Sequence, residues 1–96
     1  MAKCLSPDCG GQVDVFDAAG YVGRCDTCGL NHRRTAGTIG WNQIVGLLTV
    51  TLAAPPTVEE LAADRVVFAG RTVTIELGGG GLRTVLAEGL VSVTRG

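Results

Sequence analysis

The sequence predicts an α+β fold, in which a small metal-binding β-hairpin precedes a compact tail of two or three short helices and a short antiparallel β element. Three observations lead to this prediction. All four cysteines lie in the first 28 of 96 residues, as two pairs around a hairpin-like segment. Apolar residues recur at helical spacing after Gly40, and residues 71–77 alternate between polar and apolar types, as a half-buried strand does.

Length and composition favour one average domain or two very small ones with an aliphatic core. The chain is 46% hydrophobic and 4% aromatic, and 8 basic against 9 acidic residues give a net charge of -1. This balance argues against a disordered chain and against a strongly basic nucleic-acid binder. No apolar run follows the first basic residue, Lys3, and residues 41–54 are too short and too polar to span a bilayer. We therefore expect a cytoplasmic protein without a membrane partner, with a virion as the alternative location.

The cysteine spacing predicts a zinc site. Cys4 and Cys9 are separated by four residues, Cys25 and Cys28 by two, and fifteen residues lie between the pairs. A tetrahedral Zn²⁺ takes four thiolates at about 2.3 Å, and two cysteine turns at adjacent strand ends supply two thiolates each. Residues 12–16 and 21–24 alternate as the two strands of a hairpin, with a turn-like segment between them. Glycines after each pair suit the sharp turn that points backbone N–H groups at the sulfurs.

Three alternatives use the same cysteines. Two disulfides suit a secreted mini-protein, but the sequence begins without a secretory signal. A redox Cys-x2-Cys normally opens a helix, whereas Cys25 follows a predicted strand. An iron site has the same ligand set, and only metal analysis separates it from zinc. With four thiolates available, His32 is surplus, and we expect it to be solvated.

Residues 3–35 resemble a zinc ribbon, with Cys4, Cys9, Cys25 and Cys28 at the ligand positions. The first pair departs from the commoner two-residue spacing by two residues. The small, glycine-punctuated segment 35–40 predicts a join near Gly37. We therefore divide the chain into a zinc ribbon at residues 1–37 and a winged-helix-like or small α+β domain at residues 38–96.

Two helices are predicted at the start of the tail. The first is amphipathic and ends before Pro55, with a strand over residues 47–52 as the competitor. Its apolar face is formed by Trp41, Ile44, Val45, Leu48 and Leu52. The pattern from Thr57 to Glu60 is that of a capping box, which predicts a second helix from Val58.

The rest of the tail is predicted to hold a strand at residues 71–77, a glycine turn at 78–81, one or two helical turns at 82–86 and a terminal strand at 90–95. A β-meander of three strands from Arg71 to Arg95 is the alternative.

Residues 56–62 and 82–96 look like the two ends of a winged helix-turn-helix. This resemblance implies a DNA-binding or transcription-regulatory factor that binds duplex DNA through a recognition helix carrying Arg83. Beside the metal, Arg33 and Arg34 form either a phosphate-facing patch or a solvated turn.

The alternative function is a non-enzymatic structural or protein-interaction module, for example of a phage, with a protein partner or a homo-oligomer. Neither reading involves a small-molecule substrate, and no catalytic set remains once the thiols bind metal. A DNA-binding protein should present its basic side chains on one face, namely Arg33, Arg34, Arg65, Arg71 and Arg83. An assembly module should instead expose an apolar strand edge, which we expect at residues 71–77.

Overall fold

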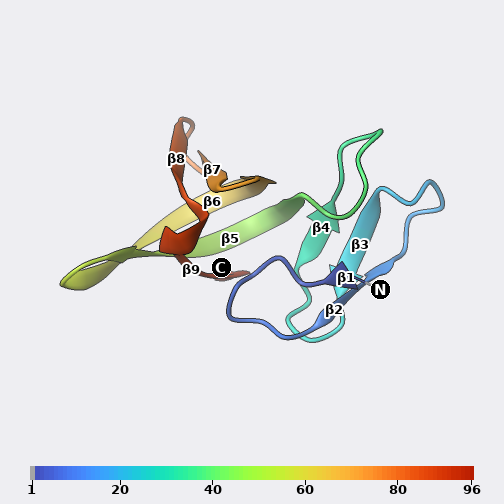
Figure 1. The fold of residues 1–96 in the computed structure, drawn as a ribbon, viewed down its shortest axis with the longest axis horizontal. Helices are drawn as coiled ribbons and strands as arrows, with labels where there is room; N and C mark the ends of the chain where they lie inside the picture. Colours follow the sequence, from blue (N-terminus) through green and yellow to red (C-terminus); the bar gives the residue numbers. More distant parts are fainter. Residues whose placement is uncertain (1) are drawn as a thin grey trace.

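The protein is an antiparallel β-sheet in the computed structural model, which describes residues 2–96 (Figure 1). Its elements in chain order are β1 (Ala2–Lys3), β2 (Gln12–Val15), β3 (Val22–Cys25), β4 (Asn31–Arg33), β5 (Gln43–Ala54), β6 (Thr57–Ala69), β7 (Thr72–Leu77), β8 (Leu82–Leu86), the 3-10 turn η1 (Ala87–Gly89) and β9 (Leu90–Arg95). Within residues 2–96, η1 is the only helical element, so the predicted α+β class is wrong. No helix in this part of the chain is long and apolar enough to cross a membrane.

The sheet is organised around the long hairpin of β5 and β6. Strands β1 to β8 pair in sequence order, and β9 pairs with β5 instead of β8. The edge of β5 opposite β6 is therefore shared: β4 covers its first part, up to the pair Asn31–Val45, and β9 covers the later part, from Leu48–Arg95. In Figure 1, β1 to β4 lie at one end of this hairpin and its tip projects at the other.

The main core is aliphatic, as the composition predicts, and lies within the C-terminal strands. It consists of eleven buried residues: Leu30, Ile44, Leu48, Val50, Leu52, Ala63, Val66, Val73, Ile75, Leu90 and Val93. One of them, Leu30, comes from the N-terminal side of the boundary predicted at Gly37, and β4 pairs with β5 across that boundary. The division into residues 1–37 and 38–96 stays a prediction, with these contacts crossing it.

The helix predicted from Trp41 to Leu52 is wrong, because this segment forms β5. Leu48, Val50 and Leu52 are buried at every second position, as a strand requires. A bulge between Val45 and Leu48 breaks this alternation, so the apolar spacing in the sequence imitates a helix.

The second predicted helix is also wrong, since residues 57–69 form β6. The Thr57 hydroxyl donates to the carbonyl of Ala54 across the hairpin turn at 3.3 Å and caps no helix. Pairing with β5 begins at Thr57, and β7 pairs with residues 63–69 on the other side. This strand pairing overrides the helix propensity of the Glu and Ala residues of β6.

The predicted strands at residues 71–77 and 90–95 are confirmed as β7 and β9, and residues 78–81 form a turn. The helical turns expected at residues 82–86 are wrong, because this segment is β8. The meander alternative fails at β9, which leaves the order and pairs with β5. The predicted winged helix-turn-helix is therefore wrong, because the two segments expected to form its helices, residues 57–62 and 82–86, lie in β6 and β8.

Candidate metal centre

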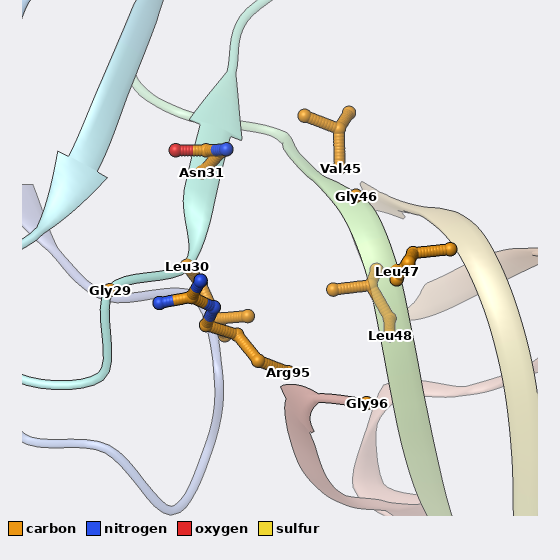
Figure 2. A pocket seen from close by; sticks show the side chains of 9 residues that line it. All are labelled: Gly29, Leu30, Asn31, Val45, Gly46, Leu47, Leu48, Arg95 and Gly96. Carbon is orange, nitrogen blue, oxygen red and sulfur yellow. The ribbon is translucent and has the colours of Figure 1, made fainter.

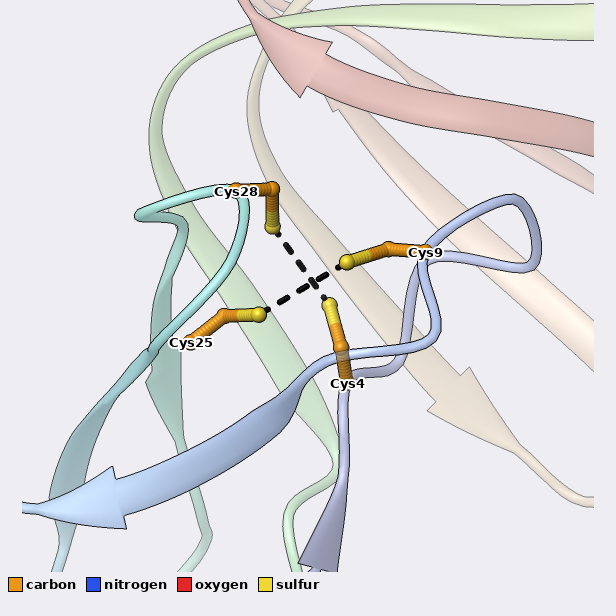
Figure 3. A group of neighbouring side chains, drawn as sticks. All are labelled: Cys4, Cys9, Cys25 and Cys28. Atoms are coloured by element: carbon orange, nitrogen blue, oxygen red, sulfur yellow. Dashed lines mark hydrogen bonds between the residues drawn. The ribbon is translucent and has the colours of Figure 1, made fainter.

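The four cysteines meet at one point between the first strands (Figure 3). Cys4 follows β1 and Cys9 precedes β2, while Cys25 ends β3 and Cys28 lies in the turn before β4. We call residues 4–9 the first knuckle and residues 25–28 the second knuckle. The hairpin predicted between them is present, since β2 and β3 pair antiparallel and bring the two knuckles together.

The sulfur positions suit a single metal ion. All four Sγ atoms lie within 4.8 Å of one another, with 3.6 Å between Cys4 and Cys28 and 3.7 Å between Cys9 and Cys25. Bonds of 2.3 Å to a tetrahedral ion place sulfurs about 3.8 Å apart, whereas a disulfide needs about 2.05 Å. All four cysteines are free, so the two-disulfide alternative is not formed. The cluster can hold a metal ion.

Backbone amides support the sulfurs within each knuckle. The N–H of Gly11 donates to Cys9 Sγ and the N–H of Thr27 to Cys25 Sγ, both at 3.4 Å. A Cβ at Gly11 would lie 2.6 Å from Cys25 Sγ, so only glycine fits there. Gly29 has the expected positive φ of 74°, whereas Gly10 and Gly11 do not adopt one. Gly11 is therefore needed because its backbone lies close to the Cys25 sulfur, and not because the turn requires a positive φ.

The thiols differ in acidity. Burial raises the pKa of Cys25, but N–H groups of Cys28 and Thr27 and the neighbouring thiols outweigh it and lower the pKa to about 7. Burial is the main cause that raises the pKa of Cys28 to about 11 and raises the pKa of Cys4 as well. Cys25 is therefore more acidic than Cys4 and Cys28, and a metal must displace protons from these two buried thiols as it binds.

His32 is buried rather than solvated, which corrects the expectation for this residue. Its Nε2 accepts the N–H of Leu5 at 3.1 Å, so Nδ1 carries the hydrogen and donates to the carbonyl of Leu30 at 3.0 Å. Burial lowers the pKa of His32 below its ordinary value of 6.5. The neutral ring therefore joins the first knuckle to the start of β4 and is not a metal ligand in this arrangement.

Trp41 covers the sheet next to the metal centre. It packs against the small cluster of Cys4, Val13 and Cys25 and meets the His32 ring edge-on at 6.5 Å. A Cβ at Gly23 would lie 2.6 Å from Cζ2 of Trp41. Trp41 was predicted to lie in a helix, and this role was missed. The available signal was Gly23, because an aromatic ring can pack flat on a strand only where the residue beneath it is glycine or similarly small.

Two of the three arginines expected to contact nucleic acid, Arg34 and Arg83, form contacts within the chain. Arg83 lies on β8, not on a helix, and its Nη1 is 2.6 Å from Oε2 of Glu59. Arg34 donates to the carbonyls of Gly20 and Thr38 and lies over the Tyr21 ring. The guanidinium groups of Arg34 and Arg83 therefore already have partners within the protein.

Of the five arginines expected on one face, Arg33, Arg34 and Arg65 line one cavity of about 340 Å³. Arg65, however, forms a two-pronged ion pair with Glu76. The recognition helix is absent and Arg65 and Arg83 are paired with carboxylates, so the helix-turn-helix basis for DNA binding is lost.

No protein-family model, curated protein or solved structure matches the chain. The metal centre and the edges of the sheet are therefore the features from which a function can be inferred. Four protein ligands leave a tetrahedral ion no open position for a substrate, which is typical of a structural site.

Proposed function

We propose that the protein is a non-enzymatic interaction module, held together by a structural zinc ion, that pairs with a second copy of itself through the edge of β8. The open edge of β8 is the observation on which this proposal depends. β8 pairs with β7 on one side, and no strand of residues 2–96 pairs with its other side. Leu82 and Leu86 on this strand are 70% and 56% exposed.

An unpaired strand edge presents a row of backbone N–H and C=O groups to which another strand can add. Such edges are commonly blocked by lysine, proline or a bulge. β8 has none of these, and its one charged side chain, Arg83, is paired with Glu59. The apolar edge expected of an assembly module thus lies on β8, whereas residues 71–77 form an interior strand between β6 and β8.

A second copy fits this edge because the strand is self-complementary. Leu82, Thr84 and Leu86 alternate onto one face of the sheet. Antiparallel pairing centred on Thr84 sets Leu82 opposite Leu86 of the second copy, on the same face, and Thr84 opposite its own equivalent. Pairing centred on Arg83 would instead oppose two guanidinium groups, which is unfavourable. The sequence of β8 therefore favours one register.

Zinc is the metal that this site suits best. Four thiolates in a closed tetrahedron are a typical structural zinc site, and zinc needs no redox partner. A non-enzymatic role is supported by the use of the side chains that could act in catalysis. The single histidine is engaged in hydrogen bonds with the backbone, and the four thiols would bind the ion, so neither is left to act as a base or a nucleophile.

Sedimentation velocity of the metal-loaded protein over a range of concentrations tests the pairing. We expect a monomer–dimer equilibrium with a dissociation constant of micromolar order or weaker, because two five-residue strands bury less than a standard interface. Leu86→Lys should abolish the dimer, whereas Val58→Lys, an exposed apolar site on the β5–β6 hairpin, should leave it unchanged. A monomer at all concentrations, or a dimer that survives Leu86→Lys, would contradict the proposal.

A further inference from the structure

The first knuckle is longer than a two-residue spacing requires, and its additional residues contact β9. The side chain of Ser6 is 1% exposed. Its Oγ accepts the N–H of Val93 at 3.0 Å and lies 3.0 Å from the carbonyl oxygen of Val93, with the Asp8 carboxylate 2.5 Å away. On its other edge β9 pairs with β5, so Ser6 takes the place of a neighbouring strand at this point.

Next to Ser6, Leu5 packs against the main core, and its N–H donates to His32. The side chains of the two residues directly after Cys4 thus contact the main core and β9. Since Cys4 and Cys9 bracket this segment, the position of Ser6 depends on both ligands of the first knuckle.

The glycine directly after the second knuckle also contacts β9, through Arg95. A Cβ at Gly29 would lie 3.0 Å from Nη1 of Arg95, so the guanidinium rests on the glycine that follows Cys28. Figure 2 shows Arg95 extending from β9 beside a cavity of about 270 Å³, which residues 29–31, β5 and the end of the chain line together. Four thiolates and a divalent ion carry a net charge of about -2, which favours a guanidinium at this position. Neither ion pair found in residues 2–96 involves Arg95.

We infer that metal binding is coupled to the docking of β9 onto β5, so that the C-terminal strand is part of the support of the metal centre. The ion fixes both knuckles. The first knuckle contacts β9 through Ser6, and the glycine directly after the second knuckle contacts β9 at Arg95. Losing the metal frees Ser6 and Gly29 from their positions, which loosens β9. By linkage, disrupting the contacts of β9 must weaken metal binding by the same factor.

Metal affinity gives the first test, with Zn²⁺ and Co²⁺ in competition with a chromophoric chelator. We expect Ser6→Ala to lower the affinity about tenfold, within the range typical of coupled sites. Ser92→Ala is the matched control, because Ser92 lies on the same strand and pairs with β5 without contacting a knuckle. Equal affinities for the wild type, Ser6→Ala and Ser92→Ala would overturn the inference.

Amide hydrogen exchange gives the second test, in the unmodified full chain with and without zinc. We expect the amides of β9 to lose protection when zinc is removed, while those of β7, whose backbone pairs with β6 and β8, keep most of theirs. Unchanged protection in β9 would overturn the inference, and so would an equal loss in β7, since the coupling would then not be specific to β9. Neither test depends on pairing through β8.

Discussion

The two regions of this sheet are stabilised in different ways. In residues 2–34 the local cluster has three buried members, Cys4, Val13 and Cys25, and two of these are metal ligands. In residues 43–96 ten aliphatic side chains form most of the main core. The first region has few buried apolar side chains, and we propose that it relies on a metal, whereas the second relies on the hydrophobic effect.

The comparison also shows that the metal region contributes to the other core. Leu30 belongs to the main core although it lies only two residues after Cys28. His32 and Ile44 are cross-strand partners, so one row of side chains continues from β4 into β5. A boundary in composition near Gly37 therefore need not be a boundary in folding.

Removing the metal should break the comparison most strongly. A strong chelator, or Cys25→Ser, should unfold residues 2–34, because structural zinc supplies roughly 10 kcal/mol or more in small domains. In amide NMR spectra we expect the signals of β2 and β3 to collapse while those of β6 and β7 stay dispersed. Thr27→Ser, which keeps the backbone N–H bound to Cys25, is the control. Unchanged β2 and β3 signals after chelation would show that the metal does not stabilise this region.

Leu30→Ala should have the next largest effect and sharpen the comparison. Leu30 is 1% exposed, and such a cavity costs about 2–5 kcal/mol. Urea unfolding followed by the fluorescence of Trp41, the single tryptophan, measures this loss. Leu47→Ala, at a side chain that is 77% exposed, should change stability by less than about 0.5 kcal/mol. If both variants behaved alike, Leu30 would not connect the two regions.

Gly23→Ala should destabilise the contact between Trp41 and β3. The new methyl group would lie 2.6 Å from the Trp41 ring and 2.8 Å from the carbonyl oxygen of Asp14, which forces a local shift costing about 1–3 kcal/mol. Thermal unfolding of the zinc-loaded protein measures this cost. The control is Gly10→Ala, where the added methyl group meets no atom within 4 Å. Equal stability of the two variants would argue against the packing of Trp41 on Gly23.

The smallest effect concerns pH. Burial lowers the pKa of His32 from 6.5, so below pH 6.5 the unfolded chain binds a proton that the folded chain does not. The contribution of His32 to stability is therefore fully present above pH 6.5 and falls as the pH decreases below it. Urea unfolding at saturating zinc between about pH 5 and pH 8 should show a weaker pH dependence for His32→Gln, which cannot take up this proton. Identical slopes for the two proteins would contradict a buried, neutral His32.

The cysteine cluster could be predicted from the sequence because its signal is local. Two short cysteine turns and the hairpin between them fix the cluster with few long-range contacts. The strands β7 and β9 were predictable for the same reason, since each alternates over its own length.

The predicted helices failed where long-range pairing decides the structure. Glu59, Glu60 and Ala62 favour a helix in isolation, but the backbone partners of β6 lie on β5 and β7. Ser6 and His32 were missed because their partners, Val93 and Leu5, are distant in the chain. The available signal for Ser6 was the spacing of the first cysteine pair. Four residues separate Cys4 and Cys9, two more than metal binding by a cysteine pair requires, which indicates a second role for this segment.

Native mass spectrometry of the purified protein tests most directly whether a metal ion organises the first region. We predict one zinc ion per chain, released by acid or by a chelator, with all four cysteines then reacting as free thiols. A chain that carries no metal and whose mass corresponds to two disulfides would contradict the account of the metal centre.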